Sequence, residues 1–529
     1  MTAKNYFLPI IAVLFLVVVY FFNSALQPLY ADEPTRALCT LEMIISDNWI
    51  PTINGETYLN KPPLYNWILI PFFKVFGFKE WVVRLPAIIS FLLLGLLVYY
   101  FNFKITRQFL PSFFTSMAVL TAGNILFYSS LLGHIDALFS VIIFSSFMLA
   151  YLLASDKKWA ILFSITYLLC FVGFMLKGIP AIVFQGFTLL TAAFFFKAWK
   201  QFFSLKHVLA SLWFILPTAL YLYAFSQEFP ILDFINNLWE ESSKRTVIQK
   251  SFWEGVKHII SFPFQFIIDT SPWSLLLFIF IDKDLRDVVK KNTFLRFCFL
   301  LFLTNVLVYW LSPDNRARYV LMLYPLFFTI IFVALFQIKK NNLSDWINGA
   351  FKIPAYLFPF IIILAAYYYQ SYLQFYTLEL LLVFALALIL LFFTFYKKSD
   401  GLMLMIFLLC TIRLGMDIII IPERIKTSEY TREKNEAHEI ANITKGKSLS
   451  MYCSNLHHNS TFYITLARFE LLKIKTKPSQ YQKDEFYLIP KTLITDSLNT
   501  TYYYSFVRRF GNMPFALVKF NNEFPRSLK

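Results

Sequence analysis

Charged residues are scarce in this chain of 529 residues, in which Asp, Glu, Lys and Arg make up only 15%. A soluble globular domain carries about 25% charged residues, most of them on its surface. Hydrophobic residues reach 58% and the mean hydropathy is +0.58. Because one large soluble core would need far more polar surface, the composition excludes a soluble protein and indicates many membrane-spanning segments.

Sequence motifs that bind nucleotides or metals are also absent. The chain has no G-x-G-x-x-G pattern and no P-loop, so no nucleotide-binding fold is expected. Its five cysteines show no C-x-x-C or other metal-ligand spacing. Cys170, Cys298 and Cys410 lie in apolar runs and are expected to be buried. Cys39 and Cys453 fall in regions expected to be exposed, and whether they pair is left open.

The chain does contain a series of apolar runs, each about 20 residues long, as a membrane-spanning helix requires. They predict an all-α polytopic protein with about 13 transmembrane helices. The first run has no small-residue cleavage site and is expected to remain as a transmembrane helix. The expected helices cover residues 6–26, 82–101, 112–132, 135–154, 159–176, 179–196, 208–226, 266–281, 294–311, 320–337, 353–371, 375–396 and 402–421.

The net charge of +16 comes from short clusters of Lys and Arg between the apolar runs. A nucleic-acid-binding domain would gather them on one face instead, so that function is excluded. With the N-terminus in the cytoplasm, nearly every loop on the same side is basic, which is what the positive-inside rule predicts for a bacterial inner-membrane protein. These residues are Lys4, Lys104, Arg107, Lys157, Lys158, Lys197, Lys200, Lys206, Lys283, Arg286, Lys290, Lys291, Lys339, Lys340, Lys397 and Lys398.

The polar C-terminal segment predicts a separate fold. It alternates polar and apolar residues in strand-like segments and has a helical pattern near 429–444. We therefore expect a transmembrane domain over residues 1–421 and a small α/β domain over residues 422–529, on the periplasmic side. The pair His457-His458 in this domain is expected at the surface, because no third metal ligand is suggested.

The loop after the first helix carries unusual charge in the segment YADEPTR and in NKPPL. Asp32 either caps a short helix that begins at Pro34, or acts as a general base or metal ligand beside Glu33. Lys61 precedes two prolines that fix its direction. It is either an interfacial anchor or a point charge for a phosphate.

Further candidates lie at the outer ends of the predicted helices. Asp136 lies at such an end, where it either caps the helix or has a functional role. Lys177 lies at another, where a cation complements the helix dipole and is either a topological signal or a functional residue. The outer loops add Arg245 and the turn SPDNRARY. Cations on this side are not topological signals, so they indicate an anionic ligand, most simply a phosphate or pyrophosphate lipid headgroup. The turn contributes three candidates, Arg316, Arg318 and Tyr319.

These segments resemble integral-membrane glycosyltransferases of the GT-C type, namely the lipid A aminoarabinose transferases and protein mannosyltransferases. The resemblance is carried by DE after the first helix, EM at Glu42, KPPL at Lys61, and GFKEWVVRLP over residues 77–86. Later pieces agree in order: Asp136, the KG-x-P turn at Lys177, the PW pair Pro272-Trp273, and the S…R…Y…P pattern over residues 312–325.

The resemblance implies transfer of a sugar from a polyprenyl-phosphate donor to an envelope acceptor, which is lipid A, another glycan or a protein. It implies that Asp32 is the catalytic carboxylate, with Glu33 and Asp136 as further catalytic candidates. Lys61, Lys177, Tyr319 and the arginines would bind the donor phosphate.

The sequence departs from the family pattern in its opening loop. The family often has Arg two residues after the DE pair, where this chain has Thr35, followed by Arg36. Aminoarabinose transferases usually carry Glu before KPPL, where this chain has Asn60. No metal ligand is assigned for that reason, and a divalent-metal cofactor and the acceptor are left open.

Two other functions remain as alternatives. A flippase or transporter of lipid-linked sugars would show internal repeats, broken helices and charges near the membrane midplane. A catalytically inactive scaffold is disfavoured because Asp32 and Lys61 are present.

Overall fold

The structure is a computed structural model of the chain. It describes residues 6–243, 252–313, 316–338, 341–368, 376–395, 400–452, 456–475, 485–494, 500–507 and 514–520. These residues form two compact units: unit 1 comprises Met1–Ser24 and Arg84–Ile421, and unit 2 comprises Ala25–Val83 and Pro422–Lys529.

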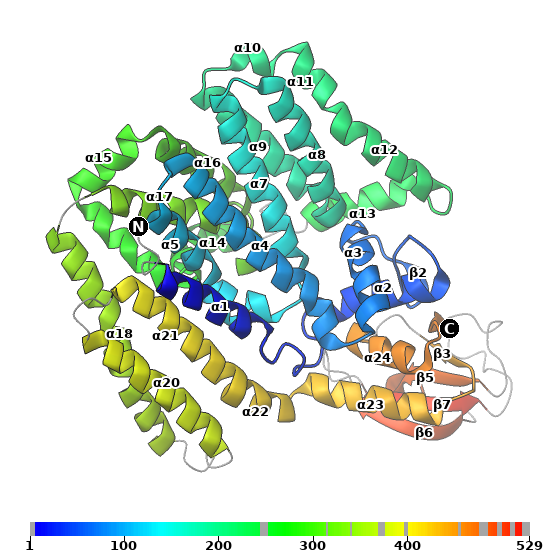
Figure 1. Cartoon of the computed structure of the whole chain (residues 1–529). Coiled ribbons are helices and arrows are strands. Elements are labelled where there is room, and N and C mark those ends of the chain that lie inside the picture. The colour runs from blue at the N-terminus through cyan, green and yellow to red at the C-terminus, as the bar shows by residue number, and fades with distance from the viewer. Residues whose placement is uncertain are drawn as a thin grey trace. The chain divides into compact units, whose positions relative to one another are not determined.

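Unit 1 is built from helices, because its apolar runs satisfy their backbone hydrogen bonds internally. Helices α7, α8 and α9 lie side by side (Figure 1), and α16 packs on both α9 and α17. The helices are α1 (Phe7–Phe21), α4 (Glu80–Thr106, which begins in unit 2), α5 (Phe109–Leu120), α6 (Gly123–Phe127), η2 (Ser129–Leu131), α7 (Ile135–Ser155), α8 (Trp159–Lys177), α9 (Pro180–Phe195), α10 (Trp199–Phe202), α11 (Leu205–Ala210), α12 (Leu212–Ser226), α13 (Ile231–Ser243), α14 (Phe252–Asp269), η4 (Trp273–Ile281), α15 (Lys283–Lys291), α16 (Thr293–Trp310), η5 (Ala317–Leu323), α17 (Tyr324–Gln337), α18 (Asn341–Tyr368), α20 (Thr377–Phe395), α21 (Gly401–Gly415) and η7 (Met416–Ile420).

The described residues confirm a multi-span membrane protein. Nine of their helices are long and apolar enough to cross a membrane, or eleven if each of two bent helix pairs is one span. Two further predicted runs coincide with the shorter apolar helices Phe7–Phe21 and Pro180–Phe195. The all-α architecture is therefore confirmed, whereas the number of thirteen spans stays a prediction.

The two bent pairs meet at their breaks. The first bends by 44° between Phe109–Leu120 and Gly123–Leu131, and the second by 112° between Trp253–Asp269 and Trp273–Ile281. The Gly123 amide donates to the Ser271 carbonyl at 2.8 Å, and the Trp273 indole donates to the Thr121 hydroxyl at 2.9 Å. Polar groups at one break therefore form hydrogen bonds with polar groups at the other, as the low dielectric of a membrane requires.

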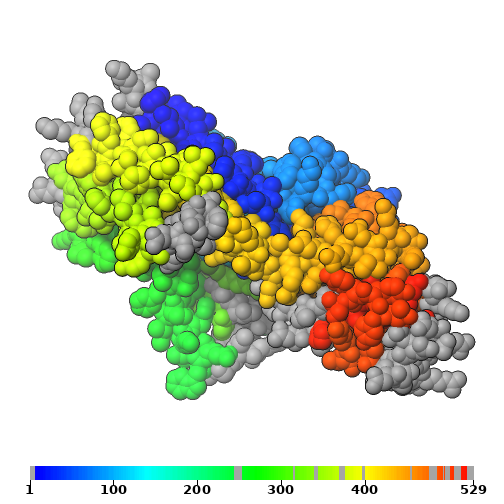
Figure 2. Space-filling model, turned by 90° about the horizontal axis from the view of Figure 1, so that it is seen from below, coloured from blue at the N-terminus to red at the C-terminus, as the bar shows by residue number. Residues whose placement is uncertain are grey.

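Unit 2 contains the small α/β fold that the C-terminal sequence predicts. A five-stranded sheet has the order β4-β3-β5-β7-β6, with β3 parallel to β4 and β5, and β7 antiparallel to β5 and β6. In the space-filling view of Figure 2, the red atoms of the last strands lie next to the orange atoms of the preceding part of unit 2. The elements are α2 (Glu33–Ser46), β1 (Thr52–Ile53), β2 (Glu56–Thr57), α3 (Leu64–Phe76), α22 (Ile421–Lys426, which begins in unit 1), α23 (Glu429–Ile443), β3 (Leu449–Met451), α24 (His458–Arg468), β4 (Lys473–Ile474), β5 (Phe486–Pro490), η9 (Lys491–Leu493), β6 (Thr500–Val507) and β7 (Pro514–Phe520).

One hydrophobic core joins both sequence segments of unit 2. Leu38 and Leu41 of α2 lie in the same buried cluster as Phe462 of α24 and Leu488 of β5. Residues 25–83 therefore pack with residues 422–529, although the sequence groups them with the membrane helices. The location of the C-terminal domain in the periplasm stays a prediction.

Four cysteines of the described chain are free and buried, which confirms burial for Cys170, Cys298 and Cys410. Cys39 is also buried, so its predicted exposure is wrong: it lies on the face of α2 that packs into unit 2. Burial raises the pKa of its thiol to about 12. Cys453 lies outside the described residues.

Candidate active site

Three charged side chains predicted from the sequence meet in unit 1. Asp136 lies in the first turn of α7, Lys177 ends α8, and Arg318 lies in η5. The Asp136 carboxylate accepts from Lys177 Nζ at 2.5 Å and lies 3.2 Å from Arg318 Nε. The three segments are far apart in the sequence, so only the tertiary fold brings these charges together.

This cluster is buried and lined by aromatic rings. The side chains of Asp136, Lys177 and Arg318 are at most 8% exposed. Lys177 Nζ lies 4.2 Å from the centre of the Tyr319 ring and 5.7 Å from that of Tyr309, distances at which a cation is attracted to a ring. Tyr319, a predicted site residue, thus lies beside these charges, and so does Tyr309, which the sequence did not predict.

His134 also belongs to the cluster but was not among the predicted site residues. Its Nε2 lies 3.0 Å from Arg318 Nη1, and because a guanidinium only donates, this nitrogen acts as acceptor. The signal was its position two residues before Asp136. With His134 neutral, these four described side chains comprise two cations and one carboxylate, so together they carry a net positive charge, which suits an anion.

In unit 2, Asp32 is the N-cap residue of α2, but its side chain makes no capping hydrogen bond. The capping interpretation is therefore wrong. Glu33, the first residue of the helix, is buried, and its Oε2 accepts from the amide of Tyr30, which precedes the helix, at 2.8 Å. Asp32 itself is exposed.

Arg36 lies one turn further along α2 and is buried. Its Nη2 donates to the Tyr58 hydroxyl at 2.6 Å, and its guanidinium lies 5.0 Å from the centre of the same ring. Burial opposes the charge of Arg36, but the electrostatic effects of Tyr58, Cys39 and Asp32 outweigh burial and raise its pKa. Arg36 is therefore a fixed cation near Asp32.

The remaining predicted residues have different environments. Lys61 is half-buried and stands just before Pro62 and Pro63, and Pro63 is the N-cap of α3. Arg316 is exposed, two residues before Arg318. Arg245 lies outside the described residues.

Glu42 of the EM pair holds the small hairpin together. Its buried carboxylate accepts from the Thr52 hydroxyl at 2.7 Å and from the amides of Asn54 and Gly55 at 2.6 and 3.1 Å. Asn54 and Gly55 both have positive φ, as a tight Asn-Gly hairpin turn requires. Burial raises the pKa of Glu42, and its three hydrogen bonds oppose that effect.

Two residues of the GFKEWVVRLP segment also have structural roles. Glu80 accepts from Lys434 and from the Tyr463 hydroxyl, the latter at 3.0 Å, and so ties α4 to α23 and α24 inside unit 2. Arg84 is buried in unit 1 and donates to the Ser24 carbonyl at 2.7 Å.

The tail histidines make local contacts. His457 lies 3.1 Å from Glu433, and His458 Nδ1 lies 2.7 Å from the Thr35 hydroxyl, both inside unit 2. Over the described ranges, no group of three or more His, Cys, Asp or Glu side chains could hold a metal ion.

Comparison with known proteins gives relatives of one kind. Residues 60–223 match the family model for dolichyl-phosphate-mannose-protein mannosyltransferases. Two undecaprenyl phosphate-alpha-4-amino-4-deoxy-L-arabinose arabinosyl transferases of Proteus mirabilis, numbered 1 and 2, are 29% and 31% identical over 188 and 190 residues. The matched segment covers 34% of this chain and 34% of each relative.

Solved structures match the whole fold. ArnT from Cupriavidus metallidurans bound to undecaprenyl phosphate superposes with a TM-score of 0.70 at 16% identity, covering 100% of this chain and 99% of ArnT. The structure of ArnT in the apo state superposes with a TM-score of 0.68 at 16% identity, covering 98% of each chain. These matches confirm the resemblance to the aminoarabinose transferase and mannosyltransferase type, and the chain has the fold of ArnT.

Proposed function

We propose that this membrane protein, which has the fold of ArnT, is a glycosyltransferase that uses a polyprenyl-phosphate donor. The donor is an undecaprenyl-phosphate sugar, as the names of the two Proteus mirabilis relatives state for those enzymes. The acceptor is an envelope molecule on the periplasmic face, with lipid A as the first candidate. The observation that carries this proposal is the net-positive buried cluster of Asp136, Lys177 and Arg318.

The cations are proposed to bind the donor phosphate. Lys177 and Arg318 are held in fixed directions by Asp136, so little reorganisation is needed when negative charge develops on the leaving phosphate. The family resemblance makes Lys61, Arg36, Arg245 and Arg316 further candidates for binding donor phosphate. Asp136 is then a positioning residue, which acts through the two cations.

Asp32 is the proposed catalytic carboxylate. The acceptor hydroxyl oxygen attacks the anomeric carbon of the donor sugar, and its proton passes to the Asp32 carboxylate. The bond between that carbon and the phosphate oxygen breaks, and polyprenyl phosphate leaves with the electron pair. This role is supported by the exposure of Asp32 and by its side chain making no capping hydrogen bond.

The test is transfer by the full-length protein in detergent micelles. We expect an undecaprenyl-phosphate aminosugar to be consumed only when lipid A is present, with modified lipid A detected by mass spectrometry. Lys61→Ala should raise the KM for the donor, whereas Lys74→Ala, a loss of an exposed lysine on α3, should not. A wild-type protein that neither binds nor consumes any polyprenyl-phosphate sugar would refute the proposal.

One observation favours the alternative of a flippase for lipid-linked sugars. The two helix breaks joined by Gly123 and Ser271 are features that such transporters use to build a binding site. Proteoliposomes with a fluorescent polyprenyl-phosphate sugar separate the two functions. Movement between leaflets without acceptor or transfer would establish the flippase instead.

The proposed orientation places the N-terminus in the cytoplasm and the C-terminal domain in the periplasm. A reporter enzyme that is active only in the periplasm should be active when fused after residue 529. The same reporter fused after residue 338, in a predicted cytoplasmic loop, should be inactive. The reverse pattern would invert the topology.

A further inference from the structure

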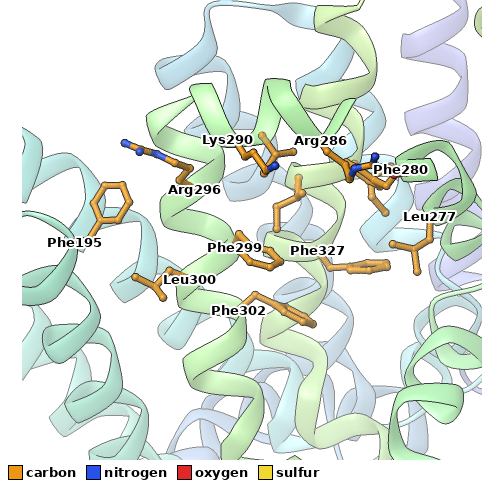
Figure 3. A pocket seen from close by; sticks show the side chains of 13 residues that line it. Phe195, Leu277, Phe280, Arg286, Lys290, Arg296, Phe299, Leu300, Phe302 and Phe327 are labelled. Atoms are coloured by element: carbon orange, nitrogen blue, oxygen red, sulfur yellow. Dashed lines mark hydrogen bonds between the residues drawn. The ribbon is translucent and has the colours of Figure 1, made fainter. Parts of the chain in front are cut away.

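A cavity of about 890 Å³ lies in unit 1 at the N-terminal end of α16 (Figure 3), and none of the charged residues around Asp136 lines it. This volume lies within the range of about 300–1,000 Å³ that is usual for ligand pockets. The cavity is lined by Phe195, Leu277, Phe280, Arg286, Val289, Lys290, Arg296, Phe299, Leu300, Phe302, Phe327, Ile330 and Ile331.

The lining has two chemically different parts. Figure 3 shows the nitrogen atoms of Arg286, Lys290 and Arg296 along one side of the cavity, with the rings of Phe302 and Phe327 on the other. The cavity is therefore apolar over most of its wall and positively charged along one edge. A ligand that fills it needs an anionic group and an apolar body.

The positive edge is not neutralised within the part of the chain that the structure describes. Arg286 Nη1 donates to the carbonyls of Phe280 and Ile281, each at 2.7 Å, and the guanidinium of Arg296 lies 5.6 Å from the centre of the Phe195 ring. These contacts orient the side chains without cancelling their charge. Neither arginine, nor Lys290, forms an ion pair with a described carboxylate, and all three are exposed.

The cavity and the charged cluster lie at opposite ends of α16. This helix has 18 residues, from Thr293 to Trp310. At 1.5 Å per residue it is about 27 Å long, close to the thickness of a bilayer core. Arg296 belongs to its first turn, whereas Tyr309, beside Lys177, belongs to its last. The cavity is thus at the opposite membrane face from the cluster, which is the face that the basic loops assign to the cytoplasm.

Helix α15 fits an interfacial position beside the cavity. Its side chain Leu285 is buried, while Arg286 and Lys290 are exposed, so one face is apolar and the other cationic. Such a helix lies in the headgroup layer of a membrane. Phe299 is 48% exposed, so the apolar wall continues onto a part of α16 that faces outward.

We propose that this cavity binds an anionic phospholipid of the cytoplasmic leaflet. Its phosphate lies against Arg286, Lys290 and Arg296, and part of an acyl chain lies among the phenylalanines. A water-soluble phosphate would gain nothing from the apolar wall. Basic pockets between transmembrane helices on this side of a membrane are the arrangement that binds anionic lipid headgroups.

The test measures lipid binding to the full-length protein in detergent by native mass spectrometry. Wild-type protein should retain phosphatidylglycerol in preference to phosphatidylcholine. The variant Arg286→Gln/Lys290→Gln/Arg296→Gln should lose this preference by about 100-fold, because each cation near a membrane surface contributes roughly a factor of five. The matched control, Lys157→Gln/Lys200→Gln/Lys206→Gln, removes three exposed cations that do not line the cavity and should keep the preference.

A second variant tests the apolar half without changing charge or the contacts of Arg286. Leu300→Trp fills part of the cavity and should weaken phosphatidylglycerol binding at least tenfold. Equal binding of the two lipids by the wild type, or an equal loss in the control, would overturn the proposal. So would unchanged binding by Leu300→Trp, competition by soluble glycerol phosphate, or stronger binding of undecaprenyl phosphate than of phosphatidylglycerol.

Discussion

Asp136 and Asp32 both stand at the start of a helix, but they meet opposite environments. Asp136 is buried in unit 1 and contacts Lys177 and Arg318. Asp32 is exposed in unit 2 and does not cap its own helix. A buried carboxylate that holds two cations serves the structure first, whereas an exposed carboxylate without a capping hydrogen bond can be reached from solvent. The same local sequence signal can therefore mark a positioning residue or a catalytic one.

The strongest test of this contrast is Asp32→Asn. We expect transfer activity to fall by about 10²–10⁴-fold, because the general base is lost, with the free energy of unfolding unchanged. The control is Asp47→Asn at the other end of α2, where Asn tolerates the left-handed backbone that Asp47 adopts. Equal activity of both variants would show that Asp32 has no catalytic role.

Replacing Asp136, which positions the two cations, should affect stability as well as donor binding. Asp136→Ala leaves Lys177 and Arg318 buried without their carboxylate, so the free energy of unfolding should fall by about 3–5 kcal/mol. Denaturant unfolding in detergent measures this change. The double variant Asp136→Ala/Lys177→Met should be more stable than Asp136→Ala, because it also removes one of the unpaired buried charges. A lower free energy of unfolding for the double variant than for Asp136→Ala would contradict the proposed pairing.

Glu42 is a third carboxylate, buried in unit 2 without a cation among its hydrogen-bond partners. Burial raises its pKa above the ordinary value of 4.5, so the folded state binds more protons than the unfolded state just above that pH. The free energy of unfolding should therefore fall as the pH rises from 4.5 through the raised pKa. Glu42→Gln should remove this dependence of the unfolding free energy on pH. Glu56→Gln, at an exposed position in the same hairpin, should keep it. If the unfolding free energies of Glu42→Gln and the wild type change with pH in parallel, this assignment is refuted.

The smallest effect is expected at the other end of α7. Asp156 pairs with Lys158 at 2.9 Å, but their side chains are 59% and 54% exposed. Such pairs contribute about 0–1 kcal/mol, so Asp156→Asn should leave thermal unfolding nearly unchanged. If Asp156→Asn lowers the stability as much as Asp136→Ala does, burial does not determine how much these two ion pairs contribute to stability.

The sequence predicted many residues of the candidate site, but it did not predict which of them contact one another. Lys177 and Arg318 were predicted from their position on the outer side, where cations are not topological signals. The sequence did not predict that both cations contact Asp136, nor that His134 contacts Arg318. Arg318 and His134 are 184 residues apart, and no local pattern relates them. The prediction that the Asp32 side chain caps the helix was wrong, because Asp32 stands at the N-cap position but makes no capping hydrogen bond.

The sequence by itself determined the membrane helices and the small α/β fold. An apolar run of about 20 residues satisfies its own backbone in a bilayer, and alternation along a strand follows from its pleat, so both are local properties. Only the tertiary structure decided that residues 25–83 pack with residues 422–529, and which charges meet around Asp136. Those outcomes depend on packing and burial summed over distant segments, which no local pattern records.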